Sequence, residues 1–126
     1  MNAQPPSADV RETLRRAYAA FNARDIEVVL SLMHQDVEWP NGMEGGYVYG
    51  HEGVRAYWTR QWDLIDPIVE PRAFGTEPDG RIVVEVRQRV LNKDGTTLSD
   101  GQVRHVYSIR DGLLRHMEIR DAGARG

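Results

Sequence analysis

TLSDGQVRHVYSIRDGLLRHMEIRD, residues 97–121, is the segment that most constrains the architecture of this chain. Apolar and polar residues alternate on both sides of Asp111-Gly112, which is the pattern of two half-buried strands joined by a hairpin turn. Two similar turn signals, Pro78-Asp79-Gly80 and Asp94-Gly95, separate further alternating segments. The second half of the chain therefore predicts four consecutive strands, over residues 68–76, 81–91, 97–110 and 113–120.

The first half has the periodicity of amphipathic helices. Ser7 predicts the N-cap of a first helix, and Asp25 that of a shorter second helix. Val37–Pro40 predicts a short extended piece, because a residue before proline avoids the α region. An irregular loop is expected from Asn41 to Gly50, followed by a third helix over residues 52–65. Helices followed by hairpins indicate an α+β fold, with three N-terminal helices packed in the concave face of a curved antiparallel sheet.

Length and composition are those of one small folded domain. The chain has 126 residues, of which 40% are hydrophobic and 28% charged, an ordinary globular balance. We expect a single domain over residues 8–121, between an N-terminal arm of residues 1–7 and a C-terminal tail of residues 122–126.

Composition and motifs also exclude several classes of function. There is no cysteine, which removes disulfides, thiolate metal sites and cysteine nucleophiles, and no histidine spacing fits a metal, so we expect no cofactor and no metal. A net charge of −3 without a basic run disfavours nucleic-acid binding. No apolar run is long enough to span a membrane, and the first residues lack the pattern of a signal peptide. We therefore expect no membrane association and a cytoplasmic location.

Two loops fit the last hairpin. A two-residue loop, Asp111-Gly112, pairs His105 with Glu118, whereas a three-residue loop, Arg110-Asp111-Gly112, pairs His105 with Met117. Burying an unpaired charge costs several kcal/mol in practice, so we choose the three-residue loop, which gathers the apolar residues on one face. That face consists of Val103, His105, Tyr107, Ile109, Leu113, Met117 and Ile119.

The chosen register turns His105 toward the helices, and Asp121 continues the same face at the end of the strand. A few polar groups in an aromatic cavity are typical of a small-molecule site. His105 is the first catalytic candidate, because the reference pKa of histidine, about 6.5, suits proton transfer near neutral pH. Asp121 is the second, as its carboxylate partner or as a base itself. The residues expected to bind the substrate are Tyr18, Trp39, Tyr57, Trp58, Trp62, Gln88, Tyr107 and Met117.

Four motifs in consistent order resemble the SnoaL-like and ketosteroid isomerase-like proteins of the nuclear-transport-factor-two-like superfamily. They are YAAFNARD at residues 18–25, VEWP at residues 37–40, GHEGV at residues 50–54 and VYSIRDGL at residues 106–113. The resemblance covers roughly residues 8–121. It implies a cone-shaped α+β barrel of the cystatin-like type.

The resemblance also implies roles for single residues. Trp39 stands where ketosteroid isomerases have their general-base aspartate, and Ala17 where they have an oxyanion-hole tyrosine, so that base is missing here. The buried acid of their fourth main strand falls on His105. Asp121 is similar in position to the acid/base aspartate of SnoaL-like cyclases. Because sheet-to-sheet dimers are common in the superfamily, we expect a homodimer through the sheet.

Residues and resemblance together favour an enzyme that performs acid/base proton transfer on a small, largely apolar carbonyl compound, of the cyclase, isomerase or dehydratase class. Two alternatives stay open. One is a non-catalytic module that binds a hydrophobic metabolite. The other is an epoxide-hydrolase-like enzyme, which requires two carboxylates and an arginine around one water.

Overall fold

The computed structural model of the chain describes residues 6–121, apart from the side chain of Asp121. The predicted tail of residues 122–126, and most of the predicted arm of residues 1–7, lie outside this range. The elements in chain order are α1 (Ala8–Asn22), α2 (Ile26–Ser31), β1 (Met33–Pro40), β2 (Tyr47–Tyr49), α3 (Gly50–Leu64), β3 (Asp66–Thr76), β4 (Ile82–Leu91), β5 (Thr97–Arg110) and β6 (Leu113–Asp121).

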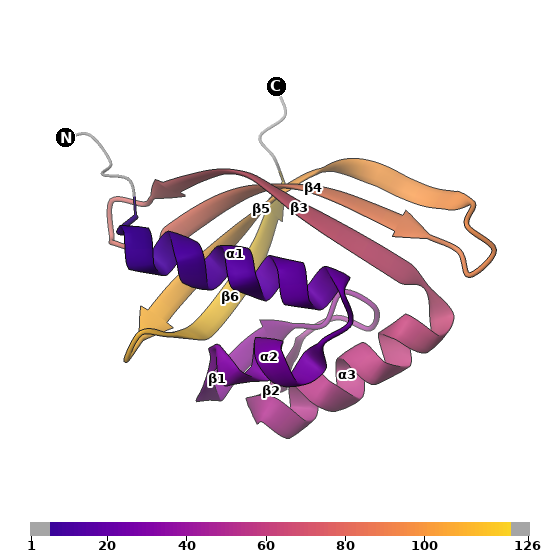
Figure 1. The fold of residues 1–126 in the computed structure, drawn as a ribbon, viewed down its shortest axis with the longest axis horizontal. Coiled ribbons are helices and arrows are strands. Elements are labelled where there is room, and N and C mark those ends of the chain that lie inside the picture. Colours follow the sequence, from indigo (N-terminus) through magenta and orange to yellow (C-terminus); the bar gives the residue numbers. More distant parts are fainter. Residues whose placement is uncertain (1–5, 122–126) are drawn as a thin grey trace.

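The six strands form one curved sheet in the order β2-β1-β6-β5-β4-β3. Figure 1 shows α1 lying across the concave side of this sheet, with α2 and α3 near β1 and β2. This confirms the predicted α+β class. The sheet is mixed rather than antiparallel, however, because β1 runs parallel to β6. Because β1 and β6 are far apart in the sequence and no turn joins them, the sequence has no local signal for their relative direction.

Side-chain caps explain where the first two helices begin. The backbone N–H of Val10 donates to Ser7 Oγ at 3.2 Å, and that of Val28 donates to Asp25 Oδ1 at 3.4 Å, as predicted. The loop predicted over Asn41–Gly50 is wrong in part, because Tyr47–Tyr49 form β2 and α3 begins at Gly50. An edge strand of three residues is too short to give an alternating pattern.

Ser7→Ala is expected to lower the free energy of unfolding by about 1 kcal/mol, because it removes the acceptor for an N–H group in the first turn of α1. Urea unfolding followed by circular dichroism measures this loss. Ser31→Ala is the matched control, since Ser31 Oγ only donates back to the Val28 carbonyl within its own helix, and we expect its effect to stay within about 0.5 kcal/mol. Equal effects of the two substitutions would contradict the capping role.

The turn of the last hairpin differs from the prediction. Asp111 and Gly112 both have positive φ, at 54° and 75°, which is typical of a two-residue hairpin turn. Arg110 pairs directly with Leu113. The predicted three-residue loop is therefore wrong.

A bulge in β6 nevertheless produces the predicted face, except at Leu113. Leu114 pairs with Ile109 and lines the cavity in its place, so the predicted inward position of Leu113 is wrong. Ile109 pairs with Leu114, but Ser108 pairs with His116, so Arg115 is an extra residue in the ladder. One extra residue changes the parity of every later pair. His105 consequently lies opposite Ile119 and faces the helices, together with Tyr107 and Met117.

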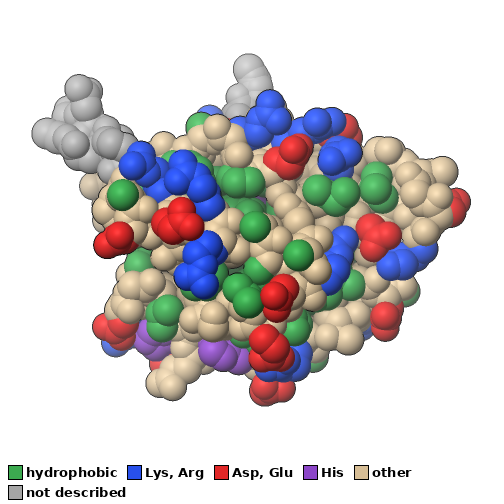
Figure 2. All heavy atoms as spheres, in the orientation of Figure 1, with side chains coloured by type: hydrophobic (Ala, Val, Ile, Leu, Met, Phe, Trp, Pro, Cys, Tyr) green, Lys and Arg blue, Asp and Glu red, His purple; other side chains and the backbone are tan. Residues whose placement is uncertain are grey.

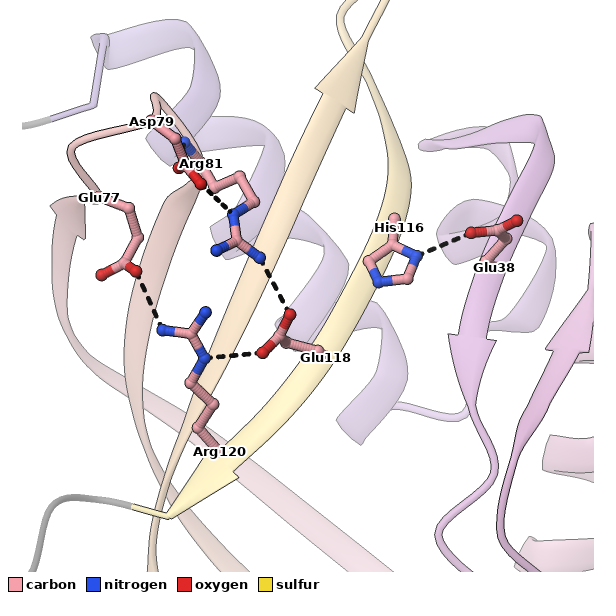
Figure 3. A network of polar contacts seen from close by, with 7 residues as sticks. All are labelled: Glu38, Glu77, Asp79, Arg81, His116, Glu118 and Arg120. Carbon is pink, nitrogen blue, oxygen red and sulfur yellow. Dashed lines mark hydrogen bonds and ion pairs between the residues drawn. The ribbon is translucent and has the colours of Figure 1, made fainter.

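Ion pairs cover the opposite face of the sheet. Figure 3 shows Glu118 between two arginines, accepting from Arg81 Nη1 at 2.9 Å and from Arg120 Nε at 2.7 Å. Arg104 Nε donates to Glu85 at 2.7 Å across β4 and β5, as the alternation predicts. The charged side chains therefore lie away from the helices, and the space beneath the helices is left to uncharged groups.

The predicted dimer surface on this face is less apolar than expected. Val83 and Val106 are apolar residues of this face, and they lie opposite each other in the ladder. Val106 is 0% exposed in the single chain, so it offers no area to a partner. Dimerisation through the sheet stays a prediction.

The side of the molecule that carries α1 has a mixed surface. Figure 2 shows basic and acidic side chains interspersed over it, with hydrophobic side chains between them. Among the helices of residues 6–121, none is both long enough and apolar enough to cross a membrane.

Candidate functional site

A cavity of about 110 Å³ lies between the helices and the concave face of the sheet. An engineered cavity of about 150 Å³ holds benzene, so this one suits a ligand of about one ring. None of the described lining side chains carries a charge. They are Ala17, Tyr18, Phe21, Val29, Trp39, Pro40, Gly42, Tyr57, Trp58, Gln61, Pro67, Val69, Gln88, His105, Tyr107, Leu114, Met117 and Ile119.

Three buried residues of the lining form a hydrogen-bonded chain. The hydroxyl of Tyr107 donates to the hydroxyl oxygen of Tyr18 at 2.8 Å, and this oxygen lies 2.7 Å from Nδ1 of His105. All three side chains are 5% exposed or less. Tyr18 comes from α1 and the other two from β5, so the packing of α1 on the sheet assembles the chain.

Proton counting links the tautomer of His105 to the direction of the hydrogen bond between the two tyrosines. The Tyr18 oxygen accepts from Tyr107, so its own proton can be donated to Nδ1 of His105. A neutral imidazole carries one N–H, which places the hydrogen on Nε2. This Nε2 is buried and has no hydrogen-bond partner among the described residues. Leaving such a group unpaired is costly, so Nε2 is the atom of His105 left to contact a ligand.

Burial keeps all three groups uncharged near neutral pH. It lowers the pKa of His105 from 6.5 to about 4. It raises the pKa values of Tyr18 and Tyr107 above the usual 10.0. Desolvation acts in the same sense on each group, since it disfavours whichever form is charged. The site therefore offers neutral hydrogen-bond donors and acceptors.

Tyr57 is held at the edge of the cavity by two donors. The backbone N–H of Gly42 donates to its hydroxyl at 3.0 Å, and the amide of Gln61 donates to it at 3.1 Å. Gln61 is missing from the predicted set. Its spacing of four residues from Tyr57 on a helix is the signal that could have found it. Gln88, which is in the predicted set, lines the cavity from β4 and is partly exposed.

The three tryptophans divide between the cavity and the core behind it. Trp39 and Trp58 line the cavity and pack edge to face, with ring centroids 5.4 Å apart. Trp62 does not line it, in contrast to the prediction. Its ring stacks on Trp58 at 5.8 Å, and the Arg24 guanidinium lies over it at 5.2 Å. Trp58 and Trp62 are four residues apart on α3, so their rings lie on the same face of the helix. Trp62 is about one turn further along the helix, beyond the end of the cavity.

The structure places the side chain of only one of the two predicted catalytic residues. His105 is buried, lines the cavity and is 4% exposed. Asp121 ends β6, where its backbone pairs with Val103. Its side chain lies outside the described residues, so its role stays a prediction. No group of three or more His, Asp and Glu side chains in the described part of the chain is arranged to hold a metal ion.

Comparisons with known proteins agree with this architecture. A family model for the SnoaL-like domain matches residues 14–117. The solved structure of TerC, co-crystallised with polyporic acid, is 34% identical with a TM-score of 0.77, over 89% of this chain and 90% of TerC. An NTF2-like protein of unknown function from Burkholderia pseudomallei is 29% identical with a TM-score of 0.78, over 91% of this chain and 92% of that protein.

A third solved structure shares the fold alone. It is an LEH-like epoxide hydrolase from Mycobacterium tuberculosis, 13% identical with a TM-score of 0.74, over 91% of this chain and 84% of that protein. The comparison with curated proteins gives no match. The similarity therefore extends across nearly the whole chain for fold and leaves the reaction to be argued from the cavity.

Proposed function

The chain belongs to the SnoaL-like domain family, and we propose that it binds a small, largely apolar carbonyl compound in its cavity and catalyses acid/base proton transfer on it. The observation that carries this proposal is Nε2 of His105, which is buried and unpaired in the lining of an otherwise aromatic and aliphatic cavity. Because no protein group occupies Nε2, this atom is free to exchange a proton with the carbon beside a carbonyl group bound in the cavity. The rings of Trp39, Trp58 and Tyr57 suit the apolar body of the ligand.

Cyclases, isomerases and dehydratases that act on carbonyl compounds share one step, in which a proton leaves or joins the carbon beside the carbonyl group. His105 is our candidate for this step, because a neutral imidazole can both accept and donate a proton. Asp121 remains the proposed second group. TerC, which is 34% identical, was crystallised with polyporic acid, and this supports an organic ligand for the present cavity.

The two alternatives differ in how the described residues support them. A non-catalytic binding module requires only the uncharged cavity, so the experiment must separate binding from turnover. An epoxide-hydrolase-like site requires two carboxylates and an arginine, and the described lining contributes neither. We therefore propose proton transfer rather than epoxide opening.

Exchange of the α-protons of cyclohexanone in deuterated buffer tests the proposal. We expect the protein to accelerate loss of the α-proton signals in the NMR spectrum, and His105→Gln to lower this rate by about 100-fold or more. Glutamine keeps a hydrogen-bonding group of similar size but cannot carry the proton. Binding is measured in parallel from tryptophan fluorescence, since Trp39 and Trp58 line the cavity.

His34→Gln is the matched control, because His34 is also buried but does not line the cavity and hydrogen-bonds to the backbone of Asp36. Its exchange rate should stay within about twofold of the wild type. Binding of cyclohexanone without accelerated exchange would favour the binding module. An unchanged rate in His105→Gln would remove His105 from the mechanism.

A further inference from the structure

We propose that Tyr107, Tyr18 and His105 form one proton relay whose two ends, the Tyr107 hydroxyl and His105 Nε2, contact the ligand at the same time. This inference rests on the proposed function, because it requires a carbonyl compound in the cavity. It adds Tyr107, at the other end of the hydrogen-bonded chain from His105, to the proposed catalytic residues. It also gives Tyr18 a positioning role between them.

The number of protons in the chain leads to this proposal. Each tyrosine hydroxyl has one proton and the neutral imidazole has one, whereas the chain has only two hydrogen bonds, of 2.8 and 2.7 Å. One proton is therefore always left at one end. When Tyr107 donates to Tyr18, the remaining proton is on Nε2, and Tyr107 keeps a free lone pair. If both hydrogen bonds reverse, Nε2 becomes an acceptor and Tyr107 becomes a free donor.

Both ends of the chain line the same cavity. A ligand can therefore meet a donor at one end and an acceptor at the other, and the two roles exchange together. The ring centroids of His105 and Tyr107 are 6.3 Å apart, with the planes at 76°, so one small molecule can lie against both rings. No charged side chain among the described lining residues competes for either end.

The relay balances for conversion of an enol to its ketone. The enol O–H bond breaks as its proton passes to the Tyr107 oxygen, and the Tyr107 proton passes to Tyr18. The Tyr18 proton passes to Nδ1 of His105, and the Nε2 proton forms the new C–H bond of the ligand. The carbon–carbon double bond becomes single and the carbon–oxygen bond becomes double. The chain ends in its reversed arrangement. After the product leaves, a water molecule that accepts the Tyr107 proton and donates a proton to Nε2 restores the starting arrangement for the next turnover.

This route forms no ion at any stage. Charging His105 or either tyrosine alone would place an unpaired charge in a cavity without a counter-charge among its described residues, and such burial is expensive. Burial already lowers the pKa of His105 and raises that of Tyr107. A neutral relay therefore suits these three groups better than transfer through a free imidazolium. The substrate class that follows is an enolisable carbonyl compound that presents an oxygen to Tyr107 and a carbon to Nε2.

Ketonisation of the acetylacetone enol, followed by loss of its ultraviolet absorbance, tests the relay. We expect the wild type to accelerate it, and Tyr18→Phe and Tyr107→Phe each to lower kcat by about 100-fold while KM changes by less than about threefold. The kcat of the double variant should lie within about twofold of that of the slower single variant, since the two hydroxyls act as a unit. Tyr49→Phe, at an exposed tyrosine of β2, is the control and should keep the wild-type rate.

A second measurement uses only the wild type, so it does not depend on folding of the variants. In mixtures of light and heavy water, transfer of several protons in one step gives a curved dependence of kcat on deuterium content, and transfer of one proton gives a straight line. A curve supports the relay and a straight line overturns it. The relay is also overturned if Tyr18→Phe and Tyr107→Phe keep rates within about fivefold of the wild type. If His105→Gln is slow in that case, the proposed function still stands. A wild-type rate in His105→Gln, or no acceleration by the wild type, overturns both.

Discussion

Trp58→Ala should lower the free energy of unfolding by about 3–5 kcal/mol, because it removes a large ring from the core and leaves space that its neighbours cannot fill. Trp58 is 1% exposed. It packs edge to face on Phe21 at 5.1 Å and on Trp39 at 5.4 Å, and stacks on Trp62 at 5.8 Å. Aromatic pairs of this kind add about 0.5–1.5 kcal/mol each beyond the area they bury. Urea unfolding followed by far-ultraviolet circular dichroism gives the change.

Thr59→Ala is the matched control for this substitution, since Thr59 is the next residue of α3 and is exposed. We expect its effect to stay within about 0.5 kcal/mol. Trp58→Phe keeps an aromatic ring and should cost less than Trp58→Ala. A loss below about 1 kcal/mol in Trp58→Ala would mean that the cavity beside this ring collapses to fill the space, and the ring would then not support the site.

Local signals in the sequence predict local features of the fold. Ser7 and Asp25 cap the helices they precede, because a cap involves residues only three apart. The direction of β1 depends instead on its pairing with β6 at the other end of the chain. No short segment carries that information, so the predicted sheet is antiparallel where the real one is mixed.

The sequence predicts which side chains of β5 face inward, but it does not predict how β5 pairs with β6. The cost of burying charge selects which residues face the helices, and this selection is correct for His105 and Tyr107. The turn chemistry of Asp111-Gly112 allows two loop lengths. The three-residue loop gives the inward face without a bulge, but the chain adopts the two-residue loop. Arg115 restores the parity as an extra residue. Burial thus determined the face, while the bulge determined which residues pair.

The polar chain of the site shows the same division. Strand alternation predicts that His105 faces inward and that Tyr107 accompanies it. The contact between His105 and Tyr18 spans 87 residues, and helical periodicity alone gives no distance between α1 and β5. Trp62 shares a helical face with Trp58 and was therefore expected in the cavity, although one more turn of α3 carries it beyond. Positions along an element are readable from sequence, whereas the length of the cavity along that element is not.

Lowering the pH from 6.5 to 4 is expected to reduce the stability of the fold by about 3 kcal/mol through His105 alone. The pKa of His105 in the folded state, about 4, lies below the ordinary value of 6.5 that it has when unfolded. Between these two pH values the unfolded chain binds a proton at His105 and the folded chain does not. The free energy of unfolding therefore falls as the pH falls through this window, by at most about 1.4 kcal/mol per pH unit. Above pH 6.5 the contribution is fully present.

His105→Gln isolates this effect, because every other titrating group is shared with the wild type. Carboxylates such as Glu38, whose pKa is lowered mainly by its hydrogen bond to His116, also lose their stabilising contacts in acid, and they do so in both proteins. The informative quantity is thus the difference between the two urea-unfolding curves at each pH. We expect the wild type to lose stability faster than His105→Gln between pH 6.5 and 4, and the two slopes to agree above that range. Parallel slopes throughout would mean that the pKa of His105 is the same in the folded and the unfolded protein. Burial would then not keep His105 uncharged, and the uncharged relay would lose its physical basis.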